Sequence, residues 1–302
     1  MIKILKLNAA IFSVILLVSI SKLNAQGQAN NAQQTRSGLT YKIIPGNDGA
    51  KPQQGEFAKF QLKYTAGTKD SVLHSSFNTI PDYIPVDTSA QAQYSFMEII
   101  PKMAEGDSAY IVVSVDSLVN KKMIPAYNET FKEGSNIKCQ VKLLKVFSSD
   151  SAVKEDYEKE TELEKNREIK NIEAYMTKSG LKGVKTKSGA YVVIETPGDA
   201  TLKADSGKVA SIKYKGYLFN GSVFDTNMDS TKGHTEPIQV NVGKEEVIKG
   251  WDEALPYFGK GGKGKVFVPA MLGYGPQPMG NEIPAYSNLI FDIEIADITA
   301  QP

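Results

Sequence analysis

Cysteine and histidine are scarce in this 302-residue sequence, which has one of the first and two of the second. A lone cysteine, Cys139, excludes a disulfide within the chain, and its place in an alternating apolar run indicates a buried structural thiol. His74 and His234 lie in separate polar stretches, without a second histidine or cysteine at metal-ligand spacing. We therefore expect no metal, no cofactor and no histidine-based triad, and we interpret both histidines as exposed loop residues.

An excess of charge of either sign is also absent, because 35 basic side chains are balanced by 34 acidic ones. Proteins that bind nucleic acids usually carry a basic surplus or a high pI, so this balance argues against a nucleic-acid partner. The content of 41% hydrophobic and 23% charged residues is typical of globular domains.

The apolar run Ala9–Ile20 is shorter than the ~20 residues that a membrane helix needs. It follows two lysines and precedes Ala25, an arrangement typical of a cleaved signal peptide over 1–25. No cysteine follows it, so lipid attachment is not expected. We expect an exported, periplasmic protein that begins near Gln26 and has no stable membrane anchor. The alternative is that the run is retained as an anchor.

Three stretches of the first half recur in the second half, namely 35–41 in 186–191, 60–67 in 211–216, and 99–113 in 254–268. An offset of about 150 residues is the size of one domain, which indicates a duplicated domain rather than a solenoid. The chain length also suggests two domains. We place these domains at 26–149 and 181–302.

The stretch 150–180 connects the two halves, and its part 151–178 is rich in glutamate and lysine and has no proline or glycine. These features predict one long charged helix, capped by one of residues 149–151 and ended by Gly180. Its weak apolar stripe is typical of a helix that bridges domains through solvent, and its length would be ~40 Å. A dimerising coiled coil is the alternative, although the apolar spacing breaks the heptad register at Leu163.

The second half has the pattern of a half-buried sheet with one helix. Apolar and polar residues alternate over 210–218, 238–242, 266–268 and 289–295, which predicts strands. The apolar residues of 247–255 fall on one helical face. A sheet with one amphipathic helix laid on it is an α+β arrangement.

Five motifs follow one another in this half: YKGYL at 214–218, GSVFD at 221–225, GKEEVIKGW at 243–251, GYG at 273–275 and LIFD at 289–292. In this order they resemble the FKBP-type peptidyl-prolyl cis-trans isomerases, the macrolide-binding proline isomerases. The resemblance implies, for each half of the chain, a curled antiparallel β-sheet wrapped around a short α-helix. It also implies that a substrate proline is held between sheet and helix.

The resemblance further implies the residues of the site. Those that act on the reacting amide would be Tyr214, Phe224, Asp225, Trp251, Tyr274 and Phe291. Those that complete the substrate-binding walls would be Ile238, Val247, Ile248 and Ile283. Trp251 would be the floor under the proline ring, Tyr274 would donate a hydrogen bond to a substrate carbonyl, and Asp225 would hold Tyr214 or a neighbouring polar group.

Three departures from the family pattern lie around this site. Ile238 stands where the family often has a phenylalanine wall, and 226–236 reads as an inserted loop. In the flap 276–286, Ala285 stands where a second proline is common. We expect these changes to affect substrate preference more than the chemistry.

Such a site needs no nucleophile, metal or proton transfer. Rotation about an X-Pro bond has a barrier of ~18–20 kcal/mol because resonance gives the C–N bond double-bond character. An apolar, aromatic site favours the twisted, less polar amide over the planar one, which is differential binding of the transition state. The expected partners are unfolded or partly folded proline-containing polypeptides, together with macrolide inhibitors.

Two functions from other classes compete with this interpretation. One is a non-catalytic chaperone or interaction module that uses the same cleft to bind unfolded chains. The other is a structural surface protein, for which the sequence lacks the expected low-complexity or repeat arrays.

The first half lacks most of the site. Aligned on the repeat, the residues opposite Tyr214, Phe224, Asp225, Trp251 and Phe291 are Tyr64, Leu73, His74, Phe96 and Cys139, respectively. The region opposite 273–275 reads DSLV at 116–119. We expect a degenerate domain that binds unfolded segments, pairs with another copy, or spaces the active domain; a homodimer would form through it or through the charged helix.

Overall fold

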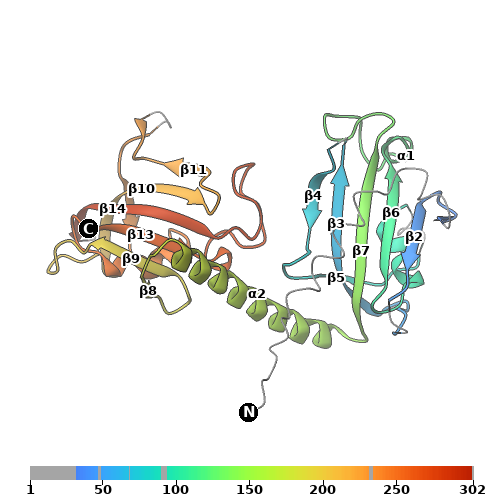
Figure 1. Cartoon of the computed structure of the whole chain (residues 1–302), viewed down its shortest axis with the longest axis horizontal. Helices are drawn as coiled ribbons and strands as arrows, with labels where there is room; N and C mark the ends of the chain where they lie inside the picture. Colours follow the sequence, from blue (N-terminus) through green and yellow to red (C-terminus); the bar gives the residue numbers. More distant parts are fainter. Residues whose placement is uncertain (1–31, 47–48, 68, 90–93, 231–233, 301–302) are drawn as a thin grey trace, which may run out of the picture. The chain divides into compact units, whose positions relative to one another are not determined.

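The computed structural model describes residues 32–46, 49–67, 69–89, 94–230 and 234–300 (Figure 1). The predicted signal peptide, 1–25, lies outside these residues. The chain divides into two compact units, Met1–Tyr157 and Glu158–Pro302. Their boundary falls inside the long helix α2 (Asp150–Lys178), which occupies the stretch of the predicted charged helix. Within the described residues, no helix has the length and apolar character needed to cross a membrane.

The first unit is built on a seven-stranded antiparallel sheet with the order β1-β2-β6-β7-β3-β4, in which β5 also pairs with β3. Its strands are β1 (Gln33–Gln34), β2 (Thr40–Ile44), β3 (Phe57–Ala66), β4 (Ser71–Ser75), β5 (Asp82–Pro85), β6 (Ser108–Ser114) and β7 (Asn136–Phe147). Two 3-10 turns, η2 (Phe96–Glu98) and η3 (Ile100–Lys102), lie between β5 and β6, and the short helix α1 (Val115–Asn120) follows β6.

The second unit repeats this topology strand for strand, with the order β8-β9-β13-β14-β10-β11 and with β12 paired to β10. Its strands are β8 (Val184–Lys185), β9 (Tyr191–Thr196), β10 (Lys208–Leu218), β11 (Val223–Thr226), β12 (Ile238–Asn241), β13 (Lys263–Val268) and β14 (Leu289–Ala300). Helix α3 (Lys249–Ala254) and η5 (Leu255–Tyr257) precede β13, and η6 (Ala270–Leu272) follows it. The predicted α+β class with two related sheets is confirmed.

One detail of the fold prediction is wrong for the first unit. The element that its sheet wraps is the pair of 3-10 turns η2 and η3, not an α-helix. Its counterpart in the second unit is α3, which continues into η5. Pro101 is the second residue of η3, as Pro256 is of η5, and neither proline can donate a backbone hydrogen bond.

A clasp of hydrogen bonds is duplicated with the fold. In the second unit, Glu253 accepts bonds from the hydroxyls of Thr186 and Ser188. In the first unit, Glu98 accepts a bond from Ser37, whose hydroxyl also contacts that of Thr35 at 2.9 Å. These residues belong to the first of the three repeated stretches and to the wrapped turn or helix. The clasp ties the start of each sheet to the element that the sheet wraps.

The polar sequence of α2 predicts a helix that bridges through solvent. The second part of α2 instead packs on the second sheet. Ile172 is fully buried and Met176 is 5% exposed, and both pack on the outer face of the second sheet against Val193, Phe267 and Ile290. Nearer its start, Asp156 accepts bonds of 2.6 Å from Lys59 Nζ and from the hydroxyl of Tyr83. The apolar contacts of α2 are few and lie in its last turns. The polar composition of the helix as a whole therefore does not reveal them.

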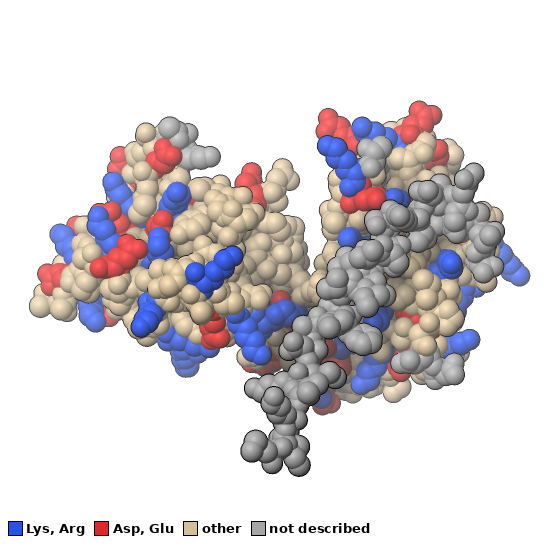
Figure 2. Space-filling model, viewed as in Figure 1, with Lys and Arg blue, Asp and Glu red and all other residues tan. Residues whose placement is uncertain are grey.

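Charge on the surface is mixed, as the balanced composition indicates. On the visible face of each unit, basic and acidic side chains are interspersed (Figure 2).

Candidate active site

Four aromatic side chains from four elements form the centre of the candidate site. Trp251 on α3 contacts Tyr214 on β10 with a ring-centroid distance of 5.3 Å and Phe291 on β14 with one of 5.1 Å, both edge to face. Phe224 on β11 meets Phe291 at 5.7 Å, again edge to face. Edge-to-face pairs have a preferred geometry, and they stabilise the cluster beyond the burial of apolar area. The centre is therefore a preorganised apolar surface.

Trp251 is 4% exposed, and its indole N–H is buried without a hydrogen-bond partner among the described residues. Most buried polar groups in proteins have a partner, so an orphaned donor in an aromatic cluster is a feature to be explained. The fixed direction of the ring comes from the helix start at Lys249 and from its two aromatic neighbours.

Gly216 makes room for the two phenylalanines. A Cβ at this position would lie 2.5 Å from the Phe224 ring and 2.9 Å from the Phe291 ring. Strand register places Gly216 opposite both Asp225 and Phe291. A glycine at this one strand position thus lets both rings approach the sheet backbone.

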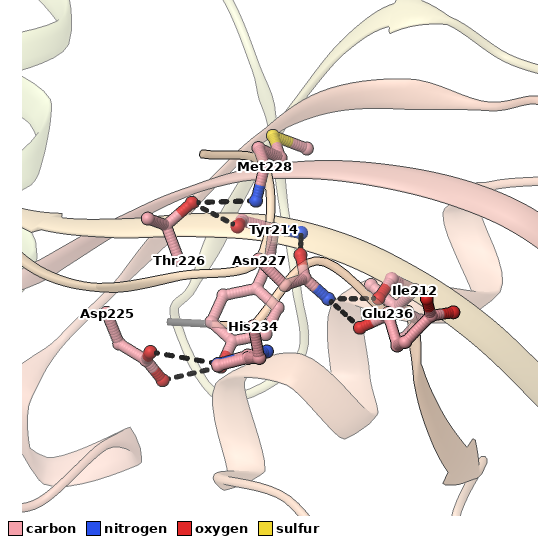
Figure 3. Close-up of polar contacts among 8 residues, drawn as sticks. All are labelled: Ile212, Tyr214, Asp225, Thr226, Asn227, Met228, His234 and Glu236. Carbon is pink, nitrogen blue, oxygen red and sulfur yellow. Dashed lines mark hydrogen bonds and ion pairs between the residues drawn. The ribbon is translucent and has the colours of Figure 1, made fainter. Parts of the chain in front are cut away.

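Asp225 lies at the edge of the aromatic cluster, at the end of β11. Its Oδ2 accepts the Tyr214 hydroxyl at 2.5 Å, and its Oδ1 lies 3.6 Å from Nε2 of His234 (Figure 3). Burial, followed by the bond to Asp225, raises the pKa of Tyr214, so this hydroxyl stays protonated and oriented at neutral pH. This hydrogen bond is the contact through which Asp225 would hold Tyr214 in place.

The inserted loop 226–236 is tied to the sheet by Asn227, which is 1% exposed. The Asn227 side chain accepts the Tyr214 N–H at 2.6 Å and donates to the carbonyls of Ile212 and Glu236, each at 3.0 Å (Figure 3). Asn227 therefore holds the far end of the loop close to its beginning. His234, near that end, is kept beside Asp225.

Tyr274 and the flap complete the site. Tyr274 is half-buried and packs on the aromatic cluster, and burial raises the pKa of its hydroxyl, which remains a donor. The Gly275 N–H donates to the Ala270 carbonyl at 2.8 Å, and the Tyr286 N–H donates to the Gly275 carbonyl at 2.8 Å. Tyr274 thus directly precedes Gly275, whose N–H and carbonyl both take part in backbone bonds that close the turn.

The structure brings all the sequence-predicted site residues together. Those that lie in the hydrophobic cluster of the second unit, or pack against it, are Tyr214, Phe224, Ile238, Val247, Ile248, Trp251, Tyr274, Ile283 and Phe291. Asp225 joins them through the Tyr214 hydroxyl. Val247 and Ile248 precede α3 rather than lie on it, since the helix begins at Lys249 with Ile248 as its N-cap.

Strand register corrects one first-unit correspondence. Tyr64 pairs with Cys139 and His74, as Gly216 pairs with Phe291 and Asp225. Tyr64 therefore stands at the position of Gly216, and Leu62 stands at that of Tyr214. Lys63-Tyr64 resembles Lys213-Tyr214 in sequence. In the sheet, however, Lys63-Tyr64 occupies the positions of Lys215-Gly216, two residues further along the strand. The predicted counterparts of Phe224, Asp225 and Phe291 agree with the register.

Among the described residues of the first unit there is no equivalent aromatic surface. Tyr64 fills the space that Gly216 leaves open, and its ring meets that of Phe96 at 6.1 Å. Leu73 is 42% exposed, and His74 pairs with Asp82 at 3.4 Å. Helix α1 occupies the position of η6 and of the turn that carries Tyr274.

Sequence reasoning missed three residues around the site, namely Asn227, His234 and Glu168. His234 was interpreted as a plain loop residue; it is half-exposed but paired with Asp225. Asn227 directly follows the GSVFD motif and Thr226, and a short amide in that position was a usable signal. Glu168 is 2% exposed, and nothing distinguishes it from the other glutamates of its helix in sequence.

Comparison with known proteins places this geometry in a family. Residues 200–296 match the model of the FKBP-type peptidyl-prolyl cis-trans isomerases. The chain is 36% identical to the FK506-binding protein of Neisseria meningitidis serogroup A, over 36% of this chain and 97% of the relative. It is 44% identical to the FKBP-type peptidyl-prolyl cis-trans isomerase FkpA of Buchnera aphidicola, over 41% of this chain and 47% of the relative. This chain thus spans about half the length of that FkpA. It belongs to the FKBP-type peptidyl-prolyl cis-trans isomerase family.

Proposed function

We propose that the second unit catalyses cis–trans isomerisation of X-Pro bonds in unfolded or partly folded polypeptides. The observation that carries this proposal is the edge-to-face cluster of Trp251, Tyr214, Phe224 and Phe291, bordered by the Asp225–Tyr214 bond. The family match covers the same residues.

The geometry supports catalysis by desolvation and orientation. A proline ring laid on Trp251 loses water from its amide, and the planar form, which is the more polar, loses more solvation than the twisted form. The Tyr274 hydroxyl orients the substrate through a carbonyl, and the Asp225–Tyr214 bond keeps the Tyr214 ring in place. No residue gives or takes a proton in this scheme. Rotation then needs less of the ~18–20 kcal/mol that resonance imposes in water.

The first unit is proposed to have no isomerase activity of its own. Tyr64 and Cys139 close the space that the second unit uses, and α1 replaces the turn of Tyr274. Its proposed role is to bind unfolded segments or a second copy of the chain, or to space the active unit. The charged composition of α2 leaves its first half as an alternative dimer contact.

We also propose that the protein assists the folding of exported chains in the periplasm. The support is the sequence pattern of residues 1–25, a basic start followed by an apolar run and Ala25. X-Pro isomerisation takes tens of seconds or longer without a catalyst, so chains that fold after export gain from it. Macrolides that match the aromatic surface would compete with these substrates.

A protease-coupled isomerisation assay on the full chain tests the proposal, with Phe96→Ala as the matched control for Trp251→Ala. We expect Trp251→Ala to lower kcat/KM by about tenfold or more, Asp225→Leu to lower it less, and Phe96→Ala to leave it unchanged. Circular dichroism checks that each variant is folded. A wild-type chain that accelerates no X-Pro substrate overturns the proposal. Suppressed aggregation of a proline-free client would then favour the non-catalytic chaperone.

A further inference from the structure

Helix α2 reaches the active-site flap through one buried carboxylate. Glu168 Oε2 accepts the backbone N–H of Met271 at 2.9 Å, and the Glu168 carbonyl accepts the side-chain amide of Asn288 at 3.0 Å. Met271 lies before the flap 276–286 and Asn288 lies after it. The Asn288 Oδ1 also accepts the N–H of Ala270 at 3.0 Å. Both ends of the flap are thereby joined to one turn of α2.

This carboxylate is placed where it costs stability. Glu168 is 2% exposed, and its Oε1 is buried without a hydrogen-bond partner among the described residues. Burial of an ionised group with incomplete hydrogen bonding is unfavourable, and an apolar side chain of similar size would pack there at lower cost. A costly group that is retained at the base of a flap indicates a role other than stability.

A short chain of bonds leads from Glu168 to Tyr274. Met271 belongs to η6 (Ala270–Leu272), and the Gly275 N–H donates to the Ala270 carbonyl at 2.8 Å. The Tyr286 N–H then donates to the Gly275 carbonyl at 2.8 Å, at the end of the flap. Tyr274 directly precedes Gly275, so a shift of the Ala270–Met271 backbone is passed on to the backbone that carries the Tyr274 side chain.

We propose that Glu168 is a positioning residue of the isomerase site: its carboxylate holds Met271 before the flap, its main-chain carbonyl holds Asn288 after the flap, and the carboxylate contact sets where the Tyr274 hydroxyl lies. The inference rests on the proposed isomerase function and extends the site to a helix that precedes the region matched by the family model. Glu168 touches no substrate; it acts through Met271 and Asn288.

The charge on Glu168 makes this contact sensitive to pH. Burial raises its pKa from 4.5 to about 7; the bond from Met271 opposes the shift and the nearby Glu164 adds to it. The other charges that act on it, Arg167 and Lys165, also come from α2, whereas the residues on either side of the flap that bond to Glu168, Met271 and Asn288, are uncharged. Above neutral pH the carboxylate accepts the Met271 N–H as a charged, stronger acceptor.

Hydrogen exchange on the full chain tests the contact independently of activity. In Glu168→Ala we expect the amides of Gly275 and Tyr286 to exchange about tenfold faster or more, as local opening of the flap becomes easier. Glu164→Gln is the matched control, because Glu164 is also buried on α2 but pairs with Arg167 of the same helix. Unchanged exchange in Glu168→Ala overturns the proposal even if the protein is an active isomerase.

The pH profile of the isomerase assay supplies the second readout. Since rotation about the X-Pro bond transfers no proton, we expect a wild-type kcat/KM that rises through about pH 7 and a flat profile in Glu168→Gln. His234→Gln should keep the rise, which assigns it to Glu168 rather than to the histidine. We expect Glu168→Ala to lose about tenfold in kcat/KM and Glu168→Gln to recover part of that loss. A rise that persists in Glu168→Gln overturns the proposal, whereas an inactive wild type with faster flap exchange in Glu168→Ala overturns only the isomerase function.

Discussion

The two units share one strand order and one clasp, yet in the part of the chain that the structure describes only the second unit has an aromatic site. The difference is concentrated in a pair of opposed positions. Gly216 and Phe291 face each other in the second unit, and Tyr64 and Cys139 occupy the same positions in the first. The large and small side chains have changed strands, so the core volume is kept while the open face of the site is lost. A fold of this kind tolerates such an exchange, because packing needs only the total volume.

The outer faces of the two sheets also differ in the polarity of their side chains. In the second unit Val193, Phe267 and Ile290 lie under the end of α2. Register places Lys42, Val112 and Lys138 at these positions in the first unit, where Val112 is 36% exposed. The outer face of the second sheet therefore packs against α2, whereas the first sheet has two lysines and a partly exposed valine at the same positions. Glu168 lies on this same helix and bonds to Met271 before the flap, so the helix and the active site occur together in the second unit.

The largest expected effect comes from adding a side chain to the second unit at the position where the first unit has Tyr64 and the second has Gly216. Gly216→Ala places a Cβ 2.5 Å from the Phe224 ring and forces both phenylalanines away from the backbone. We expect kcat/KM to fall by about tenfold or more, because the aromatic surface is displaced, while stability falls by only about 1 kcal/mol because ring ends can move. Isomerase kinetics and urea unfolding measure the two. Tyr64→Gly in the first unit should leave activity unchanged; a Gly216→Ala enzyme with wild-type kcat/KM would show that the Gly216 opening is not needed.

The two ends of α2 should respond to pH with opposite signs. The pKa of Glu168 is raised to about 7, so the folded state holds its proton longer than the unfolded state. Stability is then lost as the pH rises from about 4.5 to about 7. Glu168→Gln removes this loss, and its stability relative to wild type should improve by about 1–3 kcal/mol between pH 4 and pH 8.

Asp156 provides the opposite case in the first unit. Burial raises its pKa, but the bonds from Lys59 and Tyr83 outweigh burial and lower it. Its contribution to stability is present above the ordinary aspartate pKa and is lost on acidification below it. Asp156→Asn should therefore be destabilised at pH 7, with a difference from wild type that shrinks towards pH 3. Urea unfolding over this pH range measures both variants; parallel profiles for the two would contradict the comparison.

A smaller effect is expected at Asn227, where the first unit has Ser76 in place of a side-chain amide. Ser76 holds the position of Asn227 and exchanges two bonds of 2.9 Å with the backbone of Leu62. Asn227→Ser should keep such bonds to Tyr214 but release Glu236, at a cost of about 1 kcal/mol. Hydrogen exchange should then increase near the loop end at Glu236, which wild-type-like exchange there would contradict. Asn227→Ala, without an acceptor for the Tyr214 N–H, is the more destabilised control.

The smallest effect is expected for His234, which pairs with Asp225 on β11, much as His74 on β4 pairs with Asp82 in the first unit. His234 and Asp225 are both about half-exposed, and exposed ion pairs contribute little. We expect His234→Ala to change kcat/KM by about twofold or less. A tenfold loss in the isomerase assay would show that His234 takes a direct part in binding.

The order of motifs from Tyr214 to Asp292, the duplication and the alternating strands were open to prediction because they depend on residue type and local spacing. Family, fold class and the grouping of Tyr214, Asp225 and Trp251 follow from them. The position of Tyr64 was not predictable in this way, since a Lys-Tyr pair imitates the wrong register and the pairing with Cys139 that fixes the right one comes from a strand far along the chain. Nor was the burial of Glu168, which depends on Met271 and Asn288, more than a hundred positions away. Local sequence thus determined which residues form the site, whereas the tertiary structure alone decided which helix supports it, because burial and long-range contacts are properties of the packed chain.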